Sequence, residues 1–183
     1  MASSLAAMGF FLVLSLLIRV SGVVQRVVTV SSLQQNCKIA TQRVIATAER
    51  CDVGGVSFVQ DPALTAIALH PVEEVTATAH KRYEQTLTLY CWTRARQTLE
   101  EIHTAPLADP DRWQPHKLTG DEIGLASLRP PTRVLSRTVT DMQLYSADGN
   151  CPIRMRLDFG ANAPGFGTQT VRVERHLNVH NVL

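Results

Sequence analysis

The residues best suited to chemistry in this 183-residue chain are four cysteines. Zinc ribbons and thioredoxin-type redox sites use cysteines two residues apart, and no such pair occurs. An even number of cysteines beside an apolar N-terminal segment is typical of an oxidising compartment, where up to two disulfides could form. The disulfide candidates are therefore Cys37, Cys51, Cys91 and Cys151, and four buried reduced thiols are the alternative.

Histidines and carboxylates offer weaker possibilities. His176 and His180 share one face of a predicted strand, but a zinc site needs a third protein ligand, and none is identifiable. Asp109 and Asp111 lie in a proline-rich stretch, followed by an Asp-Glu pair at 121–122, without the spacing of an EF-hand. We therefore predict neither a metal site nor a cofactor.

No motif in the chain predicts catalysis. The G-x-S-x-G, H-E-x-x-H and Walker signatures are absent from the sequence. Cys91 lies in an alternating strand pattern, which favours a buried or disulfide-bonded thiol over a nucleophile. Lys and Arg are scattered singly, and the net charge is only +2, so no nucleic-acid partner is expected. The prediction is a protein without enzymatic activity.

The N-terminal segment is strongly apolar, and residues 1–22 are expected to form a leader or membrane segment. The run Leu5–Ile18 would span only ~21 Å as a helix, whereas a bilayer core is ~30 Å thick. That length suits a signal peptide cleaved after Gly22. A second alternative is organelle import, because arginines but no acidic residues precede Glu49; the continuous apolar run disfavours it.

The apolar pattern continues beyond Gly22 at steps of three and four residues, which predicts a helix over residues 5–51. Gly54-Gly55 would end it, and a Val-rich strand near residues 20–30 is the alternative. Its first part is apolar all round and its second part is amphipathic. The predicted buried stripe is Val27, Val30, Leu33, Cys37, Ala40, Val44 and Ala48.

From residue 56 onward the pattern changes to alternation, which indicates strands. A helical turn is expected near 97–103, and a surface loop over the proline-rich residues 104–132. The sequence thus predicts an α+β fold, with the long N-terminal helix packed on an antiparallel β-sheet and a single domain over residues 23–183. The expected strands cover residues 56–59, 64–69, 85–92, 133–145, 153–159 and 170–180.

This layout constrains the disulfides. Cys37 and Cys51 would lie ~21 Å apart along one helix, too far to bridge each other. Disulfides would then join helix to sheet, either as Cys37–Cys91 with Cys51–Cys151 or in the crossed arrangement.

Three passages carry a resemblance to a known family. Gly9-Phe10 precedes the apolar stretch FFLVLSLLI, and ATQRVIATAERCDVGGVSF leads from the helix into the first strand. The passages VLSRTVTDMQLYSADGNC, IRMRLDF and TQTVRVERHLNVHN form the last strands. In these features the chain resembles type IV pilin-like proteins, especially minor pilins and pseudopilins. Three features depart from the family pattern: Leu14 stands where the family usually has Glu, the leader lacks Lys and Arg, and Arg19 lies early in what should be a membrane helix.

The resemblance implies a structural subunit of a type IV pilus-like or secretion-system filament. Cleavage would fall between Gly9 and Phe10, and a subunit with Leu14 in place of Glu would sit at the filament tip. Its partners would be the membrane and other filament subunits or an envelope protein, with the protein in the inner membrane or cell envelope. The assembly helix would present Phe10, Phe11, Leu12, Val13, Leu14, Leu16 and Leu17. The alternative function is a secreted or envelope-associated binding domain, stapled by disulfides, with a cleaved signal peptide.

Overall fold

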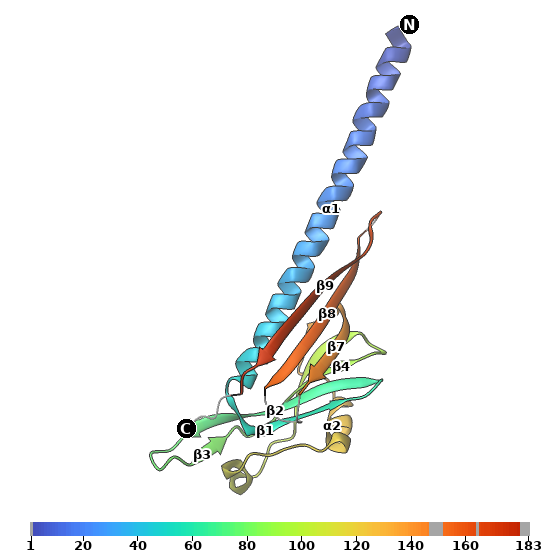
Figure 1. Ribbon diagram of the computed structural model, residues 1–183. Coiled ribbons are helices and arrows are strands. Elements are labelled where there is room, and N and C mark those ends of the chain that lie inside the picture. Colours follow the sequence, from blue (N-terminus) through green and yellow to red (C-terminus); the bar gives the residue numbers. More distant parts are fainter. Residues whose placement is uncertain (1, 147–151, 164, 180–183) are drawn as a thin grey trace.

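The computed structural model describes residues 2–146, 152–163 and 165–179, with side chains from Met8 onward. Its dominant element is α1 (Ala2–Ala48), a single 47-residue helix that extends well beyond the rest of the molecule (Figure 1). At 1.5 Å per residue it is ~70 Å long. The predicted helix is confirmed, and the alternative of a strand near residues 20–30 is wrong.

The helix ends three residues before its predicted end at residue 51, because Cys51 already begins a strand. Gly54 and Gly55 lie inside that strand, at a bulge between Cys51 and Val56. A Cβ atom on Gly55 would lie 2.7 Å from the His70 carbonyl oxygen. The glycine pair therefore permits close approach of two strands and does not cap the helix.

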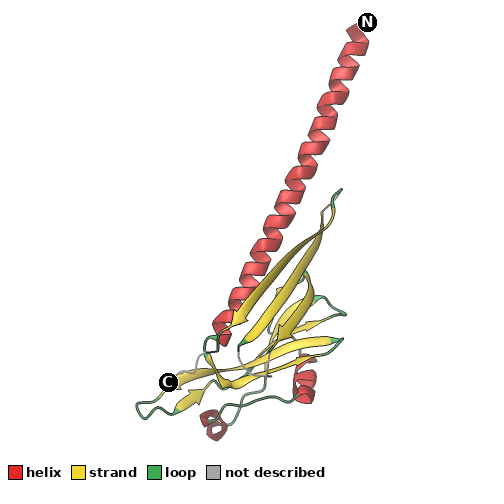
Figure 2. Ribbon diagram, viewed as in Figure 1, coloured by secondary structure: helices red, strands yellow, loops and turns green. Residues whose placement is uncertain are grey.

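The strands form two antiparallel sheets beside α1 (Figure 2). The larger sheet has the order β1-β2-β4-β5-β6, with β3 paired to β2, and the smaller sheet has the order β7-β8-β9. The larger sheet comprises β1 (Cys51–Gln60), β2 (Leu64–Val75), β3 (Lys81–Tyr83), β4 (Thr88–Thr93), β5 (Thr98–His103) and β6 (Arg133–Ser136). The smaller sheet comprises β7 (Val139–Tyr145), β8 (Ile153–Ala163) and β9 (Gly167–Leu177). The α+β class is confirmed.

Three local predictions are wrong. Residues 97–103 form no helical turn: they contain β5, whose residues 98–102 are all buried, so the strand lacks an alternating pattern. The stretch 133–145 is two strands in different sheets, separated where the chain passes from β6 to β7. Residues 104–132 contain the 3₁₀ helix η1 (Asp109–Trp113) and the helix α2 (Gly120–Ser127), which begins with a capping box between Thr119 and Glu122.

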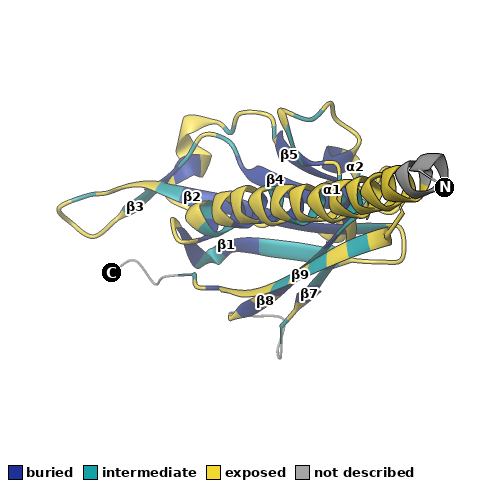
Figure 3. Ribbon diagram, turned by 90° about the horizontal axis from the view of Figure 1, so that it is seen from above, coloured by how far each residue is buried: buried dark blue, intermediate teal, exposed yellow. Residues whose placement is uncertain are grey.

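The main core lies between both sheets and the lower half of α1, which runs from Leu33 to Ala48 (Figure 3). The upper half is the part of α1 before it. The predicted stripe is buried from Leu33 to Ala48, whereas Val27 is exposed and Val30 is half-buried. The apolar face of β8 meets this stripe, as predicted. The β8 residues in this core are Ile153, Met155, Leu157 and Phe159.

A second core covers the opposite face of the larger sheet. Ile123 and Ala126 of α2 pack there on Ala66, Ala68 and Leu89, together with Cys91 and Ile102. The central strands are therefore covered on both faces.

Candidate functional site

The upper half of α1 is the most unusual surface of the molecule. Every large apolar side chain in the predicted assembly segment is exposed, with fractions between 41% and 69%. The segment consists of Phe10, Phe11, Leu12, Val13, Leu14, Leu16 and Leu17. Soluble surfaces rarely leave so large a contiguous apolar area uncovered, which marks this segment as a site of contact with lipid or protein.

The region Met8–Ala48 is the one helix, within the part of the chain that the structure describes, long and apolar enough to cross a membrane. None of its most apolar stretch is buried by the rest of the molecule. An N-terminal signal sequence would meet the same criterion, so this finding is compatible with a membrane anchor or a signal segment.

The predicted cleavage residues Gly9 and Phe10 lie inside this exposed helix. A Cβ atom on Gly9 would meet nothing within 4 Å, and Phe10 contacts Phe11 edge-on at 6.4 Å between ring centroids. Both residues are thus accessible, and cleavage between them stays a prediction.

The lower half of α1 is tied to the larger sheet by an ion pair. The Arg43 guanidinium donates two hydrogen bonds to the Glu101 carboxylate on β5, each 3.1 Å long. Burial by itself would raise the pKa of Glu101, but the hydrogen bonds and charge of Arg43, with help from His103, lower it. One turn further along, the Thr47 hydroxyl lies 2.7 Å from the Tyr90 hydroxyl. These contacts fix the orientation of α1 on the domain.

A third contact holds α1 much higher, at the tip of the β8–β9 hairpin. The Phe166 ring lies over Gly22, where a Cβ atom would come within 2.8 Å of the ring. The Arg26 guanidinium stands 5.8 Å from the centre of the same ring and donates a 3.2 Å hydrogen bond to the Gln169 side chain. The small residue at position 22, which suggested a signal-peptide cleavage site, therefore also has a packing role.

The predicted bridges from Cys37 and Cys91 are wrong, whereas the predicted Cys51–Cys151 bridge involves a residue outside the described part of the chain. Cys37 and Cys91 are buried free thiols, and both proposed arrangements require Cys91 in a bridge. Because side chains alternate along β4, Cys91 faces the α2 core, whereas Cys37 and Cys51 lie in the core beneath α1. The Cys51 thiol donates to the Thr47 carbonyl over 3.2 Å, and Cys151 lies outside the described residues.

Cys91 is also poorly suited to nucleophilic chemistry. Burial, with a contribution from the charge of Glu100, raises the pKa of this thiol to about 12. A thiol with such a pKa is almost entirely protonated near neutral pH, so its reactive thiolate form is absent.

The candidate metal ligands do not converge. His176 is exposed on β9, and His180 lies outside the described residues. Asp109 pairs with Arg82 and Arg112, and Asp111 is exposed. In the Asp121-Glu122 pair, the Glu122 carboxylate caps α2. Among the described residues, no group of three or more His, Cys, Asp or Glu side chains is placed to hold a metal ion.

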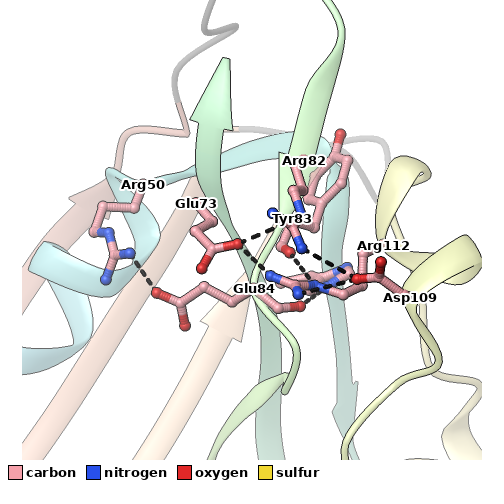
Figure 4. A network of polar contacts seen from close by, with 8 residues as sticks. Arg50, Glu73, Arg82, Tyr83, Glu84, Asp109 and Arg112 are labelled. Atoms are coloured by element: carbon pink, nitrogen blue, oxygen red, sulfur yellow. Dashed lines mark hydrogen bonds and ion pairs between the residues drawn. The ribbon is translucent and has the colours of Figure 1, made fainter. Parts of the chain in front are cut away.

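A polar network holds η1 against β2 and β3 (Figure 4). Arg112 is almost fully buried, donates a 3.0 Å hydrogen bond to the Tyr83 carbonyl and pairs with Glu73 and Asp109. Arg82 pairs with the same two carboxylates. Every carboxylate in this cluster faces an arginine, so the network stabilises the loop and leaves no unpaired base.

A comparison of this chain with known protein families, curated proteins and solved structures finds no match.

Sequence reasoning missed the contacts that position α1. A glycine inside a long helix costs about 1 kcal/mol relative to alanine, so Gly22 was a visible signal of close packing. Its partner Phe166 gave no such signal, because it lies in a turn far along the chain.

Proposed function

We propose that this chain is a membrane-anchored, non-enzymatic subunit that assembles with other subunits through the upper half of α1, as type IV pilin-like proteins do. The observation that carries the proposal is the continuity of α1. One 47-residue helix is packed on the domain from Leu33 to Ala48, is touched by the hairpin tip at Gly22, and stands free from Met8 to Ser21. A signal peptide destined for removal would not need to continue the helix that forms the core of the mature domain.

The exposed segment requires a cover. Burial of a large apolar side chain is worth about 1.5–3 kcal/mol, so the seven assembly residues together represent on the order of 10–20 kcal/mol. A bilayer supplies that cover before assembly, and the helices of neighbouring subunits supply it in a filament. Leu14 offers no carboxylate to a neighbour's N-terminal amine, which supports a place at the filament tip over a place along the shaft.

The N-terminus of the exported protein tests this proposal. Intact-mass measurement should find a chain that starts at Phe10. A start near Val23 would instead support the secreted binding domain, and a start near residues 40–50 would support organelle import.

Two matched substitutions strengthen the measurement, because each places a bulky residue at one candidate cleavage position. Gly9→Leu should leave the leader attached, whereas Gly22→Leu should still yield the Phe10 start. The reverse result would overturn the pilin-like proposal.

A further inference from the structure

The β8–β9 hairpin extends far from the sheet and runs along α1 (Figure 1). Its pairing continues without interruption from Ile153 and Leu177 to Ala163 and Gly167. Gly165 and Gly167 adopt positive φ angles of 79° and 69°, which permit the sharp turn that presents Phe166. The tip is therefore a built feature with a defined side-chain orientation.

The helix offers a matching face. Counting from the buried Leu33, steps of three and four residues lead through Val30 to Arg26, Gly22 and Arg19. The stripe that fills the core below thus continues upward as two arginines on either side of a glycine. Phe166 fills the space above Gly22, yet the residue remains 40% exposed. The cleft around it is lined by Leu17, Ile18, Gly22, Gln25, Gly165 and Phe166.

The position of this contact along α1 matches the edge of a bilayer. About 20 helical residues cross the ~30 Å hydrocarbon core, and counting that number back from Gly22 gives residues 2–21. Arg19 is the only charged residue in that stretch and lies one turn from its end, where a long side chain reaches the headgroups.

The hairpin itself could not enter the hydrocarbon core. Close to the tip, the Thr168 hydroxyl donates a 2.8 Å hydrogen bond to the Asn162 side chain, and both residues are exposed. Polar groups and an open strand edge at that depth would lose their hydration. The tip must therefore stop at the headgroups, a position that suits an exposed aromatic ring flanked by arginines.

We infer that the β8–β9 tip is a membrane-surface contact, in which Phe166 enters the headgroup region of the bilayer beside Arg19 and Arg26. This inference rests on the proposed membrane anchor and names the second point at which the subunit meets lipid. Two points of contact, one along α1 and one at the tip, would fix the tilt of the domain over the membrane.

Tryptophan probes in the uncut full-length chain test the inference. The background carries Trp113→Phe, which removes the exposed native indole, and retains the buried Trp92 in every protein. Three probes are compared: Phe166→Trp at the tip, Leu12→Trp in the anchor, and Leu128→Trp, a control that is exposed on the end of α2. Each is reconstituted into phosphatidylcholine–phosphatidylglycerol vesicles whose lipids carry bromine near the headgroup or near the chain end.

The expected result is a depth order. Leu12→Trp should be quenched most by deep bromine, Phe166→Trp most by shallow bromine with a blue-shifted emission, and Leu128→Trp by neither. Quenching of Leu12→Trp with none at Phe166→Trp would overturn the tip contact and leave the anchor standing. Absence of quenching at both positions would overturn the anchor and the tip contact together.

Discussion

The two halves of α1 differ both in hydrophobic pattern and in surroundings. From Met8 to Val28 nearly every side chain is exposed, and from Leu33 to Ala48 one stripe is fully buried. The buried stripe includes small residues such as Ala40 and Ala48, which bring the helix close to the sheets. The exposed half carries phenylalanines and leucines on all sides. A single apolar stripe at steps of three and four residues therefore distinguishes a helix that packs on its own domain from one that is apolar all round and needs an external partner.

The largest expected effect breaks the buried half. Val44 is completely buried, so Val44→Asp would place an unpaired charge in the core and should destabilise the domain by about 4 kcal/mol or more. Gln42→Asp, on the exposed face two residues away, is the control and should change stability little. Urea unfolding in detergent, followed by the fluorescence of the buried Trp92, measures both. Equal tolerance of the two charges would contradict the assigned packing face.

A smaller effect is expected at the ion pair that anchors the buried half. Arg43→Ala leaves the buried Glu101 carboxylate without its main partner. Because half of the Arg43 side chain is exposed to solvent, the loss should be about 1–3 kcal/mol, below that of a fully buried pair.

The pH dependence of that variant provides a check with a defined sign. The folded pKa of Glu101 is lowered, so its contribution is present above the unfolded pKa, near 4.5, and is lost as the pH falls through the folded value. The wild type should therefore lose more stability on acidification below that pH than Arg43→Ala does. Parallel pH profiles would contradict a stabilising role for the pair.

Acid should also lower the stability of the domain through His70, without affecting the exposed part of α1. Its Nδ1 accepts a 3.0 Å hydrogen bond from the His116 backbone amide. Its Nε2 therefore carries the proton and donates a 2.9 Å hydrogen bond to the Glu84 carbonyl oxygen. Burial lowers the pKa of His70, with a smaller contribution from His116. The neutral ring is thus favoured by folding, and stability should fall as the pH drops below the unfolded value near 6.5.

Thermal unfolding of wild type and His70→Asn across that pH range measures this contribution. The variant should be less stable at neutral pH and show a weaker dependence on pH, whereas the helicity of the segment before Val28 should change in neither protein. An unchanged pH slope in the variant would assign the acid sensitivity to other groups.

The smallest effect on stability is expected in the exposed half. Leu12→Ser removes no contact with the domain, so the free energy of unfolding should stay within about 0.5 kcal/mol of wild type. Membrane fractionation should nevertheless show a larger soluble fraction, since a polar residue replaces one in the apolar segment. A marked loss of domain stability would contradict the assignment of this half as a free surface.

The sequence predicted the parts whose patterns are local. The stripe from Leu33 to Ala48 and the alternation in β8 are visible as spacing alone, so the helix, the β8 strand and their contact were correct. Strand β5 was missed because both of its faces are buried and its acids Glu100 and Glu101 suggest a surface. The partners of these acids explain why they are buried. Arg96, which pairs with Glu100, is four residues away, but Arg43, which pairs with Glu101, lies on another element.

The contact at the top of the helix could not be predicted from local pattern. Arg26 and Gln169 are 143 residues apart in the chain, and only the folded hairpin brings them together. The predicted bridges of Cys37 and Cys91 were wrong for a related reason. The number of cysteines suggested disulfides, whereas the sheet separates Cys91 from Cys37.

The fixed position of Phe166 on Gly22 has a consequence for the thickness that α1 can match. Removal of the residues before Phe10 would leave only Phe10–Ser21 above the hairpin, a length of ~18 Å against a ~30 Å hydrocarbon core. With the hairpin in place, the shortened helix would reach little beyond one leaflet. The resulting hydrophobic mismatch would weaken its hold on the bilayer, so cleavage would by itself favour transfer of the subunit from lipid to a helical partner.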